Sequence, residues 1–219
     1  MFALNALDVD SGTLTIPEYG VWHARLRLTT DKSFVRGELA ELVMGDLSLR
    51  GRIRSGGPHV GASEYLVVGG ADGWVKRVQK RPYRTGTGVK LREVATDLAQ
   101  ETGEMITVLR GVDRDLGYAW SRPECVASSV LRDLGVKWWV EPDGTTKVGK
   151  RPFIGKSTAK LSVSSYDPSF KMAALKLADD ELSKVLPGYL VEDDLISIRV
   201  RSLDLYIQGQ KTTYLIRGA

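Results

Sequence analysis

The spacing of apolar residues changes twice along this chain, and that change constrains the fold more than any other feature. Apolar side chains recur at every second position from Leu4 to about Val78, at helical spacing within residues 85–150, and again at every second position after residue 151. A period of two is typical of half-buried strands, and a period of 3.6 of amphipathic helices. We therefore predict an α+β fold that is mainly β, with two small β-barrel-like domains at residues 1–84 and 151–219. A small α/β unit of two helices and a hairpin is expected between them, at residues 85–150.

The first β region reads as short strands separated by turns. Trp22, Ala24, Leu26 and Leu28 alternate with polar positions, and Pro17 and Gly20 mark a bend before them. A second alternating set shares one face of the segment that follows, and comprises Leu47, Leu49, Gly51 and Ile53. Several short strands with turn signals between them indicate a small barrel or sandwich.

Two helices are predicted in the central region. An apolar stripe defines the first, over Lys90–Thr102, and Gly103 stands where a left-handed C-cap would fall. The second is expected in SRPECVASSVLRDLG: Ser121 and Glu124 have capping-box spacing, and Gly135 closes the segment. A short strand, MITVL, separates the helices. A hairpin follows them, with strands at 137–140 and 145–148 around the turn Pro142-Asp143-Gly144.

The last region returns to the β pattern. The segment KMAALKLADDEL fits either a helix, through Met172, Leu175 and Ala178, or a strand, through Leu175 and Leu177. A β meander is predicted beyond it, with a hairpin turn at Gln208-Gly209-Gln210.

Composition excludes several classes of protein. The 219 residues include one cysteine and two histidines, so a disulfide within the chain and a cysteine-based zinc site are both excluded. No apolar run approaches the roughly 20 residues that span a bilayer, and no signal peptide is visible, so we expect no membrane partner.

The net charge is +4 and the pI about 9.1, which admits a nucleic-acid-binding module as an alternative. The densest basic stretch carries Lys76, Arg77, Lys80, Arg81 and Arg84. It could be a phosphate-facing patch. We favour a solvated strand end and linker, because no aromatic platform accompanies the stretch, and we expect no specific nucleic-acid partner.

Catalytic patterns are poorly represented, so a hydrolase is the weakest alternative. Ser157 and Lys160 match an SxxK spacing, but the sequence that follows resembles a strand and the companion motifs are absent. His23 and His59 have no nucleophile or paired carboxylate near them in sequence. Cys125 would lie in the first turn of the second helix, where a thiolate could be favoured, but no partner base is evident.

The remaining polar and aromatic clusters favour structural roles. The acidic runs Asp179-Asp180-Glu181 and Glu192-Asp193-Asp194 lack the spacing of a cation-binding loop and are expected to be solvated turns. Trp138 and Trp139 should point to opposite faces of a strand, one into the core and the other toward a neighbouring domain or subunit. We therefore expect no catalytic residue, no cofactor and no metal site.

The stretch from Lys90 to Lys150 resembles the baseplate hub proteins of contractile-tailed bacteriophages, namely the late control D family and the hub of Mu-like phages. The residues that carry the resemblance are LREVATDLAQETG and CVASSVLRDLGVKWWVEPDGTTKVGKRP, together with TIPEYGVWHARLRL upstream. They cover about a third of the chain and are structural in kind. This chain is shorter than many such hubs, some of which also carry a spike or lysozyme domain.

The resemblance implies two barrels that imitate two tail-tube subunits, so that three copies form a ring. It implies a non-enzymatic hub subunit that joins the tail tube to the central spike, with tube or distal tail proteins, the spike and further copies of itself as partners. The expected location is the virion baseplate, with the host cytoplasm during assembly. A distal-tail or tube adaptor of the same baseplate is a close alternative.

Overall fold

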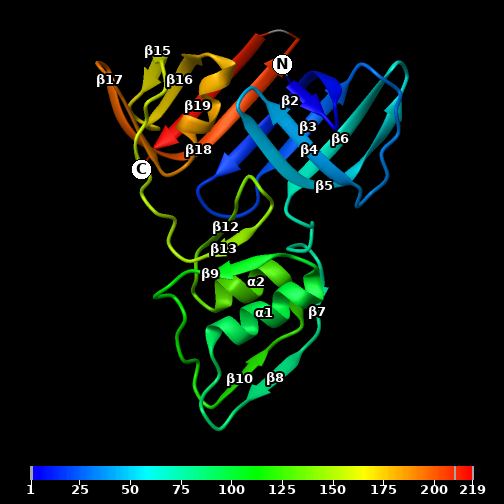
Figure 1. Cartoon of the computed structure of the whole chain (residues 1–219), viewed down its shortest axis with the longest axis vertical. Coiled ribbons are helices and arrows are strands. Elements are labelled where there is room, and N and C mark those ends of the chain that lie inside the picture. Colours follow the sequence, from blue (N-terminus) through cyan, green and yellow to red (C-terminus); the bar gives the residue numbers. More distant parts are fainter. Residues whose placement is uncertain (1, 210, 219) are drawn as a thin grey trace.

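Two groups of strands lie side by side in the protein, and a smaller unit with both α-helices extends away from them (Figure 1). The computed structural model describes residues 2–209 and 211–218, and for residue 179 the backbone alone. The fold is α+β and mainly β, as the spacing of apolar residues predicts. None of the helices in the described residues has the length and hydropathy that crossing a bilayer requires.

The first six strands close into a barrel. They span Phe2–Leu4 (β1), Leu7–Pro17 (β2), His23–Leu28 (β3), Leu39–Met44 (β4), Leu47–His59 (β5) and Ala62–Gly69 (β6). The strand order is β1-β4-β5-β6-β3-β2, and β1 pairs back onto β2. Trp22 is buried inside, where Gly51 and Gly69 leave room for its indole: a Cβ on Gly69 would lie 2.5 Å from the indole nitrogen.

The last six strands form the second barrel-like group. They span Gly155–Lys156 (β14), Leu161–Asp167 (β15), Met172–Leu177 (β16), Tyr189–Asp193 (β17), Ile196–Gln208 (β18) and Lys211–Gly218 (β19). The ambiguous segment is therefore a strand, followed by a short 3-10 helix, η1, at Asp179–Val185. The strand form prevails because β16 lies between β15 and β19 in the sheet. Gln210, in the expected hairpin turn, lies outside the described residues.

Strands β2 and β18 join the two groups. Ser11–Pro17 of β2 pairs with Ser202–Gln208 of β18, whereas the first residues of β2 pair with β1. The first residues of β18 likewise pair with β17. Along one side, each of these long strands thus pairs first with a strand of its own barrel and then with the long strand of the other barrel.

The strands of the two groups have similar neighbours in space, but they occur in a different order along the chain. In the first, the path is β4-β1-β2-β3-β6-β5; in the second, it is β14-β17-β18-β19-β16-β15. The first three strands of one group therefore correspond to the last three of the other. Two differences remain: β14 pairs with β17 in parallel, and no pairing joins β14 to β15 in the described part of the chain.

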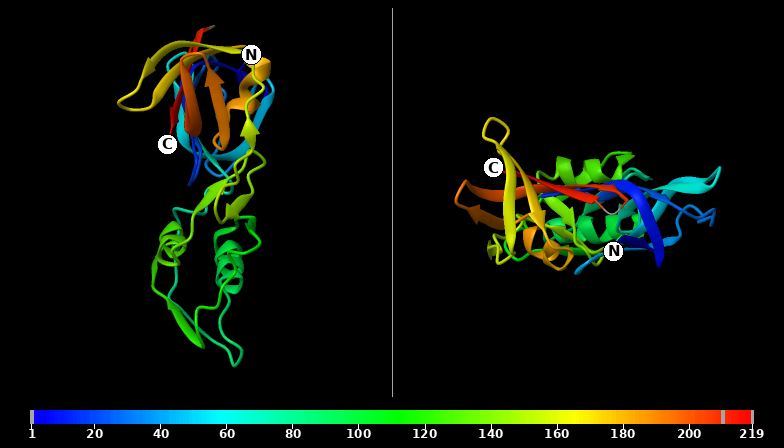
Figure 2. Two further views of the ribbon diagram at one scale, coloured as in Figure 1. Left: turned by 90° about the vertical axis from the view of Figure 1, so that its left-hand side faces the viewer. Right: turned by 90° about the horizontal axis from the view of Figure 1, so that it is seen from above.

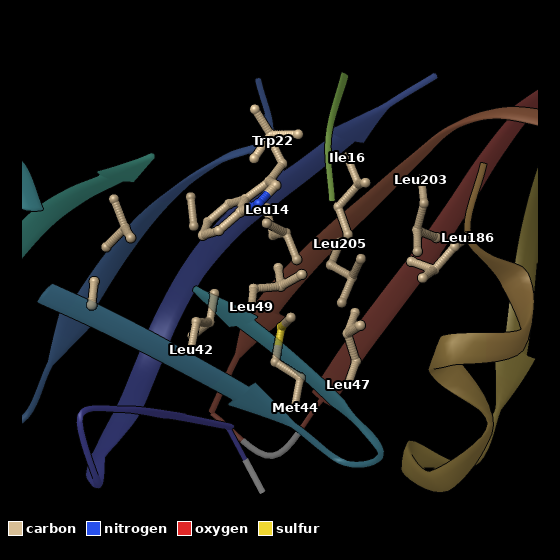
Figure 3. Packing of buried hydrophobic residues seen from close by; sticks show 14 of the residues in the cluster. Leu14, Ile16, Trp22, Leu42, Met44, Leu47, Leu49, Leu186, Leu203 and Leu205 are labelled. Atoms are coloured by element: carbon tan, nitrogen blue, oxygen red, sulfur yellow. The ribbon is translucent and has the colours of Figure 1, made fainter. Parts of the chain in front are cut away.

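The hydrophobic core is continuous across the junction between the barrels. Leu14 lies opposite Leu205, and Ile16 opposite Leu203, in the β2–β18 pairing, and all four side chains are buried. Figure 3 shows these residues between the first-barrel leucines and Leu186 of the second barrel. The two barrels therefore form one packed body.

The central unit contains both α-helices and short strands. Its elements are Arg77–Val78 (β7), Arg81–Arg84 (β8), Leu91–Thr102 (α1), Ile106–Val108 (β9), Ala119–Arg122 (β10), Cys125–Val126 (β11), Ala127–Asp133 (α2), Trp138–Val140 (β12) and Thr146–Val148 (β13). Helix α1 agrees with the prediction, including Gly103 in the left-handed region with φ 80°. The β12–β13 hairpin is also confirmed, and β9 pairs with β13 in parallel.

The second helix is shorter than predicted, and its expected start is wrong. Ser121 belongs to β10, Cys125 to β11, and α2 begins only at Ala127. The capping-box spacing is overridden because β10 pairs with β8 and β11 with β7. These partners precede the expected domain boundary at residue 84, so we propose that the central unit begins near residue 70 rather than 85.

Candidate assembly surfaces

The central unit is attached to the first barrel by a short backbone bridge. Gly20 donates its N–H to the Trp138 carbonyl at 2.7 Å, and its own carbonyl accepts from the N–H of Val140 at 3.0 Å. The N–H of Arg50 also donates to the Pro142 carbonyl at 2.7 Å. The tip of the β12–β13 hairpin therefore docks against β5 and the β2–β3 bend.

Glu104 holds the chain where it leaves the first barrel. Its carboxylate is 6% exposed and accepts the N–H of Ala71 at 3.0 Å and that of Gly73 at 2.7 Å, one on each oxygen. Burial raises the pKa of the Glu104 carboxyl above its ordinary value, because desolvation outweighs the two backbone hydrogen bonds. This buried carboxylate fixes the loop that links β6 to the central unit.

Arg151 has the matching role where the chain enters the second barrel. Its guanidinium, 5% exposed, donates to the carbonyls of Pro17 at 3.2 Å and Glu18 at 3.3 Å. It also faces the Glu141 carboxylate at 3.7 Å and the Trp139 ring at 5.4 Å. Sequence analysis missed both Glu104 and Arg151, because neither lies in a recognisable motif.

The two tryptophans of β12 point to opposite faces, as expected. Trp139 is buried and meets Tyr19 edge-on at 6.4 Å between ring centroids. Trp138 is half-buried and lies against Trp74 at 4.7 Å. Trp139 therefore strengthens the join to the first barrel, whereas Trp138 packs within the central unit.

A groove runs along this join beside β5. It consists of two adjoining pockets of about 330 and 590 Å³ that share Arg52, Ala71 and Gly103. Leu39 and Met105 stand at its wall with 66% and 62% of their surface exposed. The groove is basic and partly apolar, and a surface of this kind can contact another protein.

Two of the five charges in the basic stretch before α1 are neutralised by ion pairs. Arg77 pairs with Glu124 at 3.2 Å, Arg81 pairs with Asp97 at 3.1 Å, and Lys76 donates to the Thr102 carbonyl at 2.8 Å. Among the residues that the structure describes, only Lys80 and Arg84 of the five have no hydrogen-bond or ion-pair partner. This arrangement favours the solvated strand and linker over a phosphate track.

The catalytic candidates do not meet in one place. His23 is exposed on β3 and His59 is exposed at the end of β5; they pair with Val68 and Ala62, near opposite ends of β6. Ser157 follows β14 in an extended segment, where its hydroxyl accepts the N–H of Ala159 at 3.2 Å. The helix that an SxxK nucleophile requires is not formed there.

Cys125 is half-buried in β11 rather than in the first turn of a helix. Burial, with a smaller contribution from Asp133, raises the pKa of its thiol, which is the opposite of what an activated nucleophile needs.

The acidic runs make local structural contacts. Glu192 pairs with Lys156 at 2.6 Å, and Asp193 accepts the N–H of Val163 at 3.2 Å. Glu181 pairs with Lys184 at 2.7 Å. No cluster of three or more metal-ligating side chains occurs in the part of the chain that the structure covers.

One face of the sheet continues without interruption across both barrels. Arg25 lies beside Thr13, Thr13 beside Tyr206, and Tyr206 beside Thr213, so a single row crosses β3, β2, β18 and β19. The next row contains His23, Thr15 and Asp204. This polar face, which spans both barrels, is a candidate surface for assembly.

No protein-family model and no curated protein sequence matches the chain. Its fold is nevertheless shared with solved structures. A 43 kDa tail protein of prophage MuSo2 from Shewanella oneidensis superposes with a TM-score of 0.69 at 10% identity, over 100% of this chain and 97% of that one. A tail protein from Neisseria meningitidis gives 0.62 at 14% identity, over 99% and 96%.

A third similar structure belongs to a type VI secretion component. The E. coli c3393 protein, described as similar to the T4 tail proteins gp27 and gp5, gives a TM-score of 0.66 at 10% identity, over 99% of this chain and 76% of that one. At such identities the likeness shows the fold, and this fold occurs in phage tail proteins and in a type VI secretion component.

Proposed function

We propose that this protein is a structural, non-enzymatic subunit of a phage tail baseplate. In this proposal it is a hub-type subunit that joins the tail tube to the central spike. The observation that carries the proposal is the pair of barrel-like groups with a similar strand arrangement, joined through β2 and β18. A chain with two similar barrels can occupy two neighbouring positions of a ring, so three copies would offer six barrels to a sixfold tube and three chains to a trimeric spike.

The similar structures support this assignment through the fold. Two of them are tail proteins, and the third is described as similar to tail proteins. The catalytic candidates Ser157, Cys125 and the two histidines lie apart, which supports a structural role. The basic and partly apolar groove beside β5 is a surface that could contact another protein. The proposed partners are the tube or distal tail proteins, the spike and further copies of this chain, in the virion baseplate.

A reconstruction of the assembled tail tests the proposal. We expect three copies around the axis, between the last tube ring and the spike. Six copies in a ring would instead favour the distal-tail or tube adaptor. A position on the outer sheath or on the fibres would contradict both assignments.

A further inference from the structure

The two ends of the two-barrel body carry unpaired strand edges of different kinds. In the view from above in Figure 2, the cyan tip at residues 59–62 lies at one extreme, and the orange and yellow segments of the second barrel lie at the other. The yellow β15–β16 hairpin projects beyond the body in both views. A body with different edges at opposite ends can join head to tail with further copies of itself.

The outer edge of the projecting hairpin is largely unpaired. Within the described residues, β15 pairs only with β16, and beyond the bond from Val163 to Asp193 its outer side is open. Residues 161–167 contain neither proline nor lysine to blunt the edge. Lys160 and Pro168 stand at its two ends, and the register shifts between Val163 and Ser165. Tyr166 and Phe170 expose 39% and 73% of their surface on this hairpin.

The hairpin tip is also held in one shape. The Asp167 carboxylate accepts the N–H groups of Ser169 at 2.9 Å and Phe170 at 3.4 Å. The carbonyl of Lys171 accepts the N–H of Gly218 at 2.8 Å. An ordered tip of this kind loses little conformational entropy when it docks.

The opposite end offers an edge that a backbone can approach. Strand β5 pairs with β4 as far as Arg52, and Ile53 still bonds to the backbone of Gly37 and Glu38. Within the described residues, the segment 55–57 pairs only with β6. Gly57 has open space where its Cβ would stand, and glycine within a strand often marks the close approach of another backbone. Val60, 93% exposed, follows β5 directly, and Val35, 68% exposed, lies on the loop whose Gly37 N–H donates to the Ile53 carbonyl of β5 at 2.8 Å, so both add apolar surface at this end of the barrel. Pro58 has no N–H to donate and ends the usable edge.

We infer that the β15–β16 hairpin of one copy docks on the open edge of β5, at residues 55–57, of the next copy, with Phe170 against the Val35 and Val60 surface. The partner is thus a second copy of this chain, bound by strand addition. This inference rests on the proposed ring and names its contact. Within each copy, hydrogen-bonded strands run without a break from β5 to β15. The inferred contact would extend this sheet from one copy into the next.

Disulfide trapping tests the contact directly. In a Cys125→Ala background, Ser165→Cys and Gly57→Cys chains are mixed at high concentration and oxidised, and the same is done in assembled tails. We expect a disulfide-linked dimer, and a closed ring when one chain carries both substitutions. Ser48→Cys, at an exposed position near the other end of β5, replaces Gly57→Cys as the control. Cross-linking no greater than in this control, in both preparations, overturns the inference.

A pair of matched surface variants gives the second test. Phe170→Asp should weaken self-association by about tenfold or more, as expected for a central aromatic contact. Tyr118→Asp should leave it unchanged, since Tyr118 is also 73% exposed but lies in the central unit. Equal association of the two variants, with unchanged melting temperatures, contradicts the inferred contact. A tail with three copies but no contact between residues 57 and 165 refutes the contact alone. If the disulfide between residues 57 and 165 forms but the tail reconstruction places the chain outside the hub, the hub assignment is refuted and the contact stands.

Discussion

The Glu104 carboxylate tests whether burial or backbone hydrogen bonding dominates the ionisation of a buried group near the first barrel. Two backbone N–H groups point at its two oxygens, from Gly73 at 2.7 Å and Ala71 at 3.0 Å. Those bonds favour the ionised form, whereas burial opposes it, and burial prevails so that the pKa lies above its ordinary value of 4.5. The perturbation is Glu104→Gln, which keeps the size of the side chain and removes its titration.

The sign of the pH dependence follows from that raised pKa. Between pH 4.5 and the raised value, the folded protein binds more protons at this site than the unfolded chain does, so wild-type stability falls as the pH rises. Each unit by which the pKa is raised is worth about 1.4 kcal/mol across this window. The glutamine also leaves one buried N–H without an acceptor, a cost of about 1–3 kcal/mol that hardly varies with pH. The stability advantage of wild type over Glu104→Gln should therefore shrink as the pH increases.

Urea unfolding over a series of pH values measures this difference, with the slope m checked for a constant transition. Glu101→Gln is a matched control of opposite sign. Burial alone would raise the pKa of Glu101, but hydrogen bonds from the Gln79 N–H and from Arg122 together lower it. That contribution is present above the ordinary pKa and is lost as the pH falls. An advantage of wild type over Glu104→Gln that grows with pH would refute the reasoning.

Three further predictions concern folding and the catalytic candidates. Leu98→Ala, at a fully buried position of α1, should cost about 2–5 kcal/mol in chemical unfolding, whereas Leu195→Ala, at a position 68% exposed, should cost little; equal stabilities would contradict the burial. Gly135→Val should lower the melting temperature, because Gly135 has φ 63° and a left-handed residue other than glycine costs about 1–2 kcal/mol, whereas Gly86→Val in an open loop should not. Alanine substitution at each catalytic candidate, namely Ser157, His23, His59 or Cys125, should leave tail assembly unchanged in a complementation assay. Loss of assembly in any one variant would show that the residue has a role.

Local sequence signals predicted the parts of the fold that depend on local structure. Helix α1 has its stripe, its start beside Lys90 and its left-handed Gly103 within one continuous segment. The β12–β13 hairpin likewise carries its own turn at Gly144, with φ 85°. In both cases the residues that determine the element lie within the element itself.

The errors arose where a distant partner decides the local structure. Ser121 and Glu124 have the spacing of a helix start, but β8, about forty residues earlier in the chain, pairs with this segment as β10. The strand order of the two barrels could not be predicted either, because their blocks of three strands are exchanged along the sequence. The contacts of Glu104 and Arg151 span many residues and have no local pattern.

The two kinds of junction in this protein differ in how firmly they fix geometry. Seven register pairs between β2 and β18, with Leu14 and Leu205 packed beneath them, set the angle between the barrels through the sheet itself. The central unit is held instead by the backbone bonds at Gly20 and Arg50 and by Arg151, while Glu104 fixes the loop through which the chain leaves β6. A substitution at Glu104 or Arg151 should therefore loosen the central unit while the two-barrel body keeps its shape. Because the hairpin and the β5 edge both belong to that body, copies should still join after such a substitution, and any loss of function should appear at contacts made by the central unit.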